Sequence, residues 1–194
     1  MEKTAAPASS AGGRKKTLLK ICFTALFAAL IAGGTFIAIP IGVVPVVLQN
    51  LFALLSGLIL GPFLGSGAVA LYLLAGILGA PVFAGFTAGI ARVAGPTGGY
   101  LVGYVLMALV AGLIAGGPGK RASLGRIIIA VVAGFLAVYV PGVIWLKIQT
   151  GYTWGKALMA GFVPFLIGDV CKGIGAVLIA PRLRKTAMEH LWGA

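Results

Sequence analysis

The feature that most restricts the fold is a run of 71 residues, 21–91, without a single Asp, Glu, Lys or Arg. Two further uncharged runs cover residues 93–119 and 127–146. A helix needs about 20 apolar residues to cross a hydrocarbon core about 30 Å thick. The first run therefore has room for about three spans, and each of the other two holds one. A last apolar segment, 157–180, is also long enough to span, although it carries one acidic and one basic residue.

These runs predict an all-α membrane protein, a bundle of six transmembrane helices. Only 9% of the residues are charged, whereas a soluble domain needs about 25% to cover its surface. We expect a disordered basic tail over residues 1–17, a transmembrane domain over 18–183 and a second tail over 184–194. The Gly- and Pro-rich stretch 79–99 is too broken for one straight helix, and we interpret it as a loop that caps a pocket. The expected spans cover about residues 18–39, 46–60, 64–78, 100–116, 124–146 and 157–180.

The net charge of +12 reflects orientation in the membrane rather than nucleic-acid binding. Six spans with both termini in the cytoplasm put eleven of the 15 basic residues on the inside, before the first span, between the fourth and fifth, and after the sixth. The opposite side receives only Arg92, Lys147 and Lys156. The positive-inside rule favours this topology. We therefore expect a multi-pass protein of the bacterial inner membrane, with the lipid bilayer and not nucleic acid as its surroundings.

Asp169 and Lys172 are the charged pair of the last span. An aspartate near the centre of a spanning helix costs about 2.5–3.5 kcal/mol, so it needs a partner or a role. Lys172 lies three residues further on, on the same helix face, and can pair with it. The pair either locks helix packing or lines a cavity and holds a polar ligand.

Two further clusters offer polar groups at membrane depth. Gly95-Pro-Thr-Gly-Gly-Tyr100 combines glycines, which allow close approach of a backbone, with the hydroxyls of Thr97 and Tyr100. Gln49 and Asn50 are two amides near the external end of the second span, and amides at membrane depth often link helices by hydrogen bonds. Gln49 is either a ligand contact or such a link.

The first span carries small residues at helical spacing. Ala25 and Ala29 are one turn apart, and Ala28 and Ala32 form a parallel stripe. Small residues at this spacing let another helix approach closely. That helix belongs either to this chain or to a partner.

The sequence argues against an enzyme. The membrane region has one acidic residue, so a pair of catalytic carboxylates cannot form there. The only histidine, His190, lies in the C-terminal tail. No zinc motif or ATP-binding lysine loop occurs, and we expect no metal or cofactor.

In this order, the motifs resemble those of the BioY biotin transporters, the substrate-capturing S components of energy-coupling-factor uptake systems. The resemblance covers about residues 18–183. The motifs that carry it are Ile39-Pro-Ile-Gly-Val-Val-Pro45, Leu48-Gln-Asn-Leu-Phe52, Gly79-Ala-Pro-Val-Phe-Ala-Gly85, Gly95-Pro-Thr-Gly-Gly-Tyr-Leu101 and Pro164-Phe-Leu-Ile-Gly-Asp169 with Lys172.

The resemblance implies a high-affinity biotin-binding subunit that works with a transmembrane coupling protein and a pair of ABC-type ATPases. It also implies that Ala25, Ala28, Ala29 and Ala32 dock on the coupling protein. Asp169 and Lys172 would then contact the ureido ring of biotin. Arg92 would hold its carboxylate, with Thr97 or Tyr100 as supplements, and Phe83 and Phe86 would supply apolar walls.

Alternatives remain open at this stage. Arg92 could instead be a solvated charge at the membrane surface. The protein could be an S component for another vitamin, or a membrane scaffold that transports nothing. A cationic vitamin such as thiamine would favour more acidic residues than this chain has.

Overall fold

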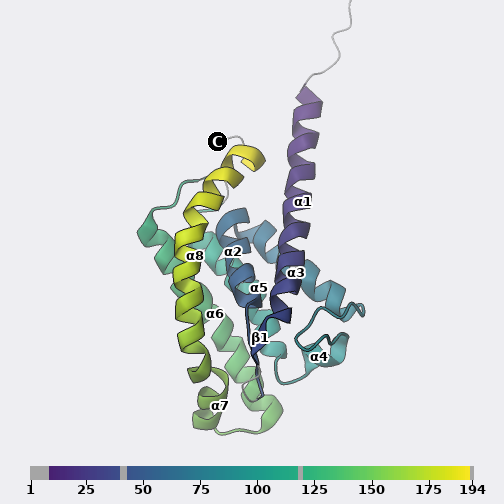
Figure 1. Cartoon of the computed structure of the whole chain (residues 1–194), viewed down its shortest axis with the longest axis vertical. Helices are drawn as coiled ribbons and strands as arrows, with labels where there is room; N and C mark the ends of the chain where they lie inside the picture. The colour runs from purple at the N-terminus through teal and green to yellow at the C-terminus, as the bar shows by residue number, and fades with distance from the viewer. Residues whose placement is uncertain (1–8, 40–42, 118–119, 193–194) are drawn as a thin grey trace, which may run out of the picture.

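The computed structural model describes residues 9–39, 43–117 and 120–192, which form an almost entirely helical bundle (Figure 1). Two short strands, β1 (Ala38–Ile39) and β2 (Val46–Val47), pair antiparallel. The helices are α1 (Ser9–Phe36), α2 (Gln49–Leu60), α3 (Pro62–Ile77), α4 (Ile90–Ala94), α5 (Gly98–Ile114), α6 (Leu124–Thr150), α7 (Trp154–Gly161), the 3-10 turn η1 (Val163–Phe165), α8 (Leu166–Ala187) and the π-helical turn η2 (Met188–Trp192).

Three segments are long and apolar enough to cross a membrane, namely Gly13–Phe36, Leu124–Thr150 and Trp154–Trp192. Three shorter apolar helices, α2, α3 and α5, pack among them. The prediction of a helical membrane protein is confirmed. The number of spans and the side on which the termini lie stay predictions.

Both ends of the described chain are more helical than expected. α1 begins at Ser9, inside the segment 1–17 for which we expected disorder, and residues 1–8 lie outside the described residues. Extending an existing helix costs little, because each added residue contributes one more hydrogen bond. At the other end α8 continues to Ala187, past the expected boundary at 183.

Glycines allow the central helices to approach one another closely. A Cβ atom on Gly65 of α3 would lie 2.6 Å from the Cα of Gly57 on α2. One on Gly103 of α5 would lie 2.8 Å from the carbonyl oxygen of Val138 on α6. Such distances are too short for real Cβ atoms, so these crossings require glycine. In Figure 1, α2 lies between α1 and α8, and it packs against both.

The last apolar segment is broken near its start. The segment expected as one helix over 157–180 is divided into α7, η1 and α8. The division falls at Pro164, in the first turn of η1, and Phe162 just before it has a backbone that is not helical. Proline cannot donate the backbone hydrogen bond that a continuous helix requires. As a result, Asp169 lies in the first turn of α8 rather than near the centre of a helix.

Candidate functional site

Asp169 lies at the centre of a buried polar network that joins three helices. Its Oδ1 accepts hydrogen bonds from Asn50 Nδ2 of α2 at 2.8 Å and from Lys172 Nζ at 3.0 Å. Its Oδ2 accepts one from the hydroxyl of Tyr139 on α6. Lys172 Nζ also donates to Asn50 Oδ1 at 3.0 Å, which closes a ring of contacts.

Helix geometry helps to stabilise the charge of Asp169. The side chain is only 5% exposed, so an unpaired carboxylate here would carry a large desolvation cost. The ion pair with Lys172 offsets part of this cost. The first turn of a helix also favours negative charge, because its free N–H groups point toward the helix start. Because of the break before α8, Asp169 lies in the first turn of a helix, where a negative charge is favoured; in a continuous helix it would lie in the middle, without this stabilisation.

The hairpin of β1 and β2 positions the start of α2. Its register sets Ala38 opposite Val47, and Leu48 N donates to the carbonyl oxygens of Gly34 and Ile37 at 3.2 and 3.1 Å. Helix α2 begins directly afterwards, so its first two side chains, Gln49 and Asn50, are both buried in the bundle.

Two cavities share five lining residues, and one of the two adjoins this network. The second cavity is lined on its polar side by Asn50, Tyr139, Asp169 and Lys172. The first is lined by Gln49, Phe83, Arg92 and Thr97 among others. The shared residues, Val44, Pro45, Val47, Tyr100 and Tyr104, make the two cavities neighbouring lobes of one site.

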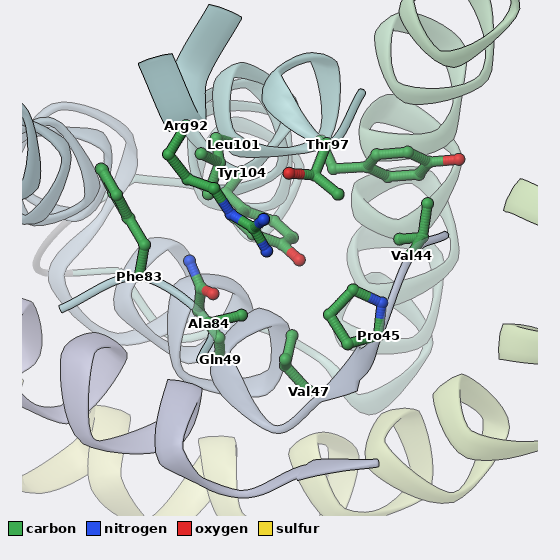
Figure 2. Close-up of a pocket in the computed structure, with 11 residues that line it drawn as sticks. Val44, Pro45, Val47, Gln49, Phe83, Ala84, Arg92, Thr97, Leu101 and Tyr104 are labelled. Carbon is green, nitrogen blue, oxygen red and sulfur yellow. The ribbon is translucent and has the colours of Figure 1, made fainter. Parts of the chain in front are cut away.

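The first lobe brings a cation and an unpaired amide together. Figure 2 shows the Arg92 guanidinium extending between Gln49 and Tyr104. Gln49 is 2% exposed, and its Oε1 accepts from Thr35 Oγ1 at 3.3 Å. Its Nε2, however, is buried without a hydrogen-bond partner among the described residues. Within that same part of the chain, the only ion pair is Asp169–Lys172, so Arg92 has no carboxylate partner.

Two of the residues singled out from the sequence are placed differently from expectation. The hydroxyl of Tyr100 donates to the carbonyl oxygen of Gly161 at 2.7 Å, so this residue contributes its ring rather than its hydroxyl to the site. Phe86 does not line either cavity. It is 69% exposed and stacks on Phe36 of α1, with ring centroids 4.8 Å apart. Its φ of 58° in the loop turns the side chain away from the site.

The alanines of α1 face in two directions. Ala25 and Ala29 are exposed, whereas Ala28 is 8% exposed and Ala32 packs partly buried against the core. Ala28 and Ala32 therefore serve packing within this chain, and only the outer stripe is free for a partner helix.

Tyr139 is a member of the network that sequence reasoning did not select, and Asn50 was noted beside Gln49 without a role of its own. Asn50 directly follows Gln49, and its position at membrane depth was a usable signal. Tyr139 is one of five tyrosines and stands in an apolar run with no spacing that relates it to Asp169. Its role depends on the packing of α6 against α8, which no local pattern encodes.

The fold and the site together define a class: a helical membrane protein with a small cavity between its helices that has polar side chains in both lobes. Comparison with known proteins narrows this class. The family model described as "BioY family" matches residues 6–189. The biotin transporter BioY of Thermotoga maritima is 44% identical over 165 residues, which cover 85% of this chain and 95% of that protein. The probable biotin transporter BioY of Pyrococcus horikoshii is 41% identical over 165 residues, covering 85% and 96%.

A solved structure agrees with these relatives. It is described as the S-component for biotin from an ECF-type ABC transporter, and it matches with a TM-score of 0.79 and 29% identity. The match covers 93% of this chain and 95% of that one. The chain belongs to the BioY family.

Proposed function

We propose that this chain is a biotin-capturing membrane subunit that mediates biotin uptake. The observation that carries the proposal is the network of Asn50, Tyr139, Asp169 and Lys172 at the wall of a cavity between the helices. The names of the relatives supply the ligand, and the chemistry of the site is complementary to it.

The network retains one acceptor site and one donor. A carboxylate offers about four lone-pair positions, and Asp169 uses three of them. An ammonium group has three protons, and Lys172 uses two. The ureido ring of biotin presents N–H donors beside a carbonyl acceptor. One N–H would bind Asp169 while the carbonyl accepts from Lys172.

The other lobe suits the carboxylate of biotin. Arg92 supplies a positive charge without an acidic partner in the described residues, and Gln49 Nε2 supplies an unused donor. Thr97 lines the same lobe with its hydroxyl, and Phe83 with an apolar ring. Arg92 is thus the residue that distinguishes an anionic ligand from a neutral one.

Ligand entry requires the walls to move. The lobes have volumes of about 30 and 20 Å³, and a single water already needs about 10–15 Å³. A bicyclic vitamin with a five-carbon chain does not fit. The loop over 79–99 supplies Phe83, Ala84, Arg92 and Thr97 to the wall of the first lobe, so we infer that this loop opens and closes over the ligand.

We further propose the arrangement in the membrane. Six spans, the three long segments with α2, α3 and α5, cross the bacterial inner membrane, and both termini lie in the cytoplasm. The parts of residues 1–17 and 184–194 that extend beyond these spans are then cytoplasmic, and the loop over 79–99 faces outside. The distribution of basic residues supports this orientation.

Energy would come from a transmembrane coupling subunit with a pair of ABC-type ATPases. The docking surface that we propose is the outer stripe of α1, formed by Ala25, Ala29 and Gly33 at successive turns. All three are exposed, and a Cβ atom added at Gly33 would meet nothing within 4 Å. A partner helix could therefore approach the backbone of α1 closely.

Equilibrium binding of radiolabelled biotin to the purified full-length chain in detergent tests the function. We expect saturable binding that excess unlabelled biotin displaces and that thiamine and riboflavin do not. Displacement by another vitamin would point to a different S component. A folded chain that binds none of the three would support the scaffold alternative.

A further inference from the structure

A cavity larger than either lobe lies in a groove between α6 and α8, with a volume of about 510 Å³. Twelve of its fourteen lining residues are apolar or glycine. The other two, Tyr139 and Asp169, direct their polar atoms at each other. The groove therefore presents a hydrocarbon surface on membrane-spanning helices.

The dimensions of the groove match one hydrocarbon chain. From Ile128 to Tyr139 along α6 the rise is about 16 Å at 1.5 Å per residue, close to half of a hydrocarbon core of about 30 Å. The volume of about 510 Å³ over this length leaves a cross-section of roughly 30 Å². A helix with side chains is at least about 10 Å across, so its cross-section is more than twice as large. The space between the two walls thus has the size of one hydrocarbon chain rather than of a whole helix.

Basic side chains continue the groove at one end. Leu178 is the last lining residue on α8, and Arg182 and Lys185 follow it at one and two turns on the same helix face. Both are exposed. On the other wall, exposed Arg121 precedes α6. An apolar slot one leaflet deep with cations at its mouth is complementary to a lipid with an anionic headgroup.

We propose that this groove binds the acyl chain of an anionic phospholipid, whose phosphate pairs with Arg182 and Lys185. The lipid would lie against the outer side of Tyr139 and Asp169, the two residues that the groove shares with the polar site. It would thus fill the space beside the network and keep that wall dry.

Native mass spectrometry of the full-length chain released from nanodiscs of mixed phosphatidylglycerol and phosphatidylcholine tests this proposal. We expect the wild type to retain phosphatidylglycerol. Val132→Trp fills the groove and should abolish retention, whereas Ile129→Trp, on the outer face of the same helix, should not. Leu136→Trp with Val140→Trp as its control provides a second pair if the first variant does not fold.

The headgroup is tested by charge removal, which leaves the groove intact. Replacing Arg182 and Lys185 by Gln should lower the preference for phosphatidylglycerol over phosphatidylcholine by about ten- to thirty-fold, since each basic residue near an anionic surface contributes about five-fold. Replacing Lys15 and Lys16, exposed on α1, should change this preference less. Equal lipid retention by Val132→Trp and Ile129→Trp would overturn the proposal. A wild-type dimer that Val132→Trp dissociates would overturn it in favour of a second copy of the chain.

Discussion

Asn50, at the start of α2, donates its amide to Asp169 on α8 at 2.8 Å, although the two residues are 119 positions apart. This hydrogen bond connects the helix that follows the hairpin with the helix that follows the break at Pro164. Both α2 and α8 begin inside the bundle, one after the hairpin and the other after the break at Pro164. Their first turns therefore bring polar side chains into contact.

Replacing Asn50 by Leu tests this connection. The change removes one bond to Asp169 and one to Lys172. Hydrogen bonds to charged groups contribute about 1.5–3 kcal/mol each, so we expect biotin affinity to fall at least about tenfold and the thermal unfolding temperature to drop. Ser56→Ala on the same helix is the control, since Ser56 bonds only backbone carbonyls away from both lobes. It should lower stability and leave affinity unchanged. Equal affinities for the Leu variant and the wild type would contradict this role.

Arg92→Gln should alter selectivity for charge rather than binding in general. In the proposed pose the guanidinium contacts only the carboxylate of biotin. The variant should therefore lose about 1.5–3 kcal/mol of affinity for biotin and little for biotinamide, whose side chain ends in a neutral amide. Competition of both compounds against labelled biotin measures the difference. Lys147→Gln, which removes a cation outside the lobes, is the matched control. A parallel loss for both compounds would show that Arg92 does not contact the carboxylate.

Arg184 should control the stability of the bundle. It is 3% exposed, and its guanidinium donates to the carbonyl oxygens of Leu58, Ala115, Gly117 and Lys120. These carbonyls lie at and beyond the ends of α2 and α5, where intrahelical partners are missing. Arg184→Met leaves them unpaired in a buried place.

We expect Arg184→Met to destabilise the fold by about 3–5 kcal/mol, measured by denaturant titration in detergent. Arg182→Met, on the exposed side of the same turn, should stay within about 0.5 kcal/mol of the wild type. If both variants unfold alike, the four carbonyls do not depend on Arg184.

Gly33→Leu should separate docking from capture. A Cβ atom added here meets nothing within 4 Å, and leucine favours a helix more than glycine does. Biotin binding and stability should therefore be unchanged, whereas co-purification with the coupling subunit and ATPases should fall sharply. Gly175→Leu on α8 makes the same substitution where an added Cβ atom also meets nothing within 4 Å, and it should not affect assembly. Normal assembly of the Gly33 variant would place the docking surface elsewhere.

The sequence predicts much of this architecture, because apolar length and charge spacing are local properties. Asp169 and Lys172 were recognisable as a pair from their separation of three residues. The break before Asp169 was harder to predict. Pro164 indicates that a helix ends near it, but the apolar segment continues without interruption and does not indicate where the next helix begins. The partners Asn50 and Tyr139 come from other helices and could not be derived from spacing. Phe86 appeared equivalent to Phe83, yet the backbone of the loop turns it toward Phe36.

The most direct test of the account is biotin binding by Asp169→Asn compared with the wild type, at equal folded content by circular dichroism and gel filtration. The substitution keeps the shape of the side chain and removes its charge. Our account predicts that the wild type binds tightly and that the folded variant loses affinity by at least about a hundredfold, equivalent to about 2.7 kcal/mol. Wild-type affinity in the folded variant would contradict the assignment of Asp169 to the ureido ring.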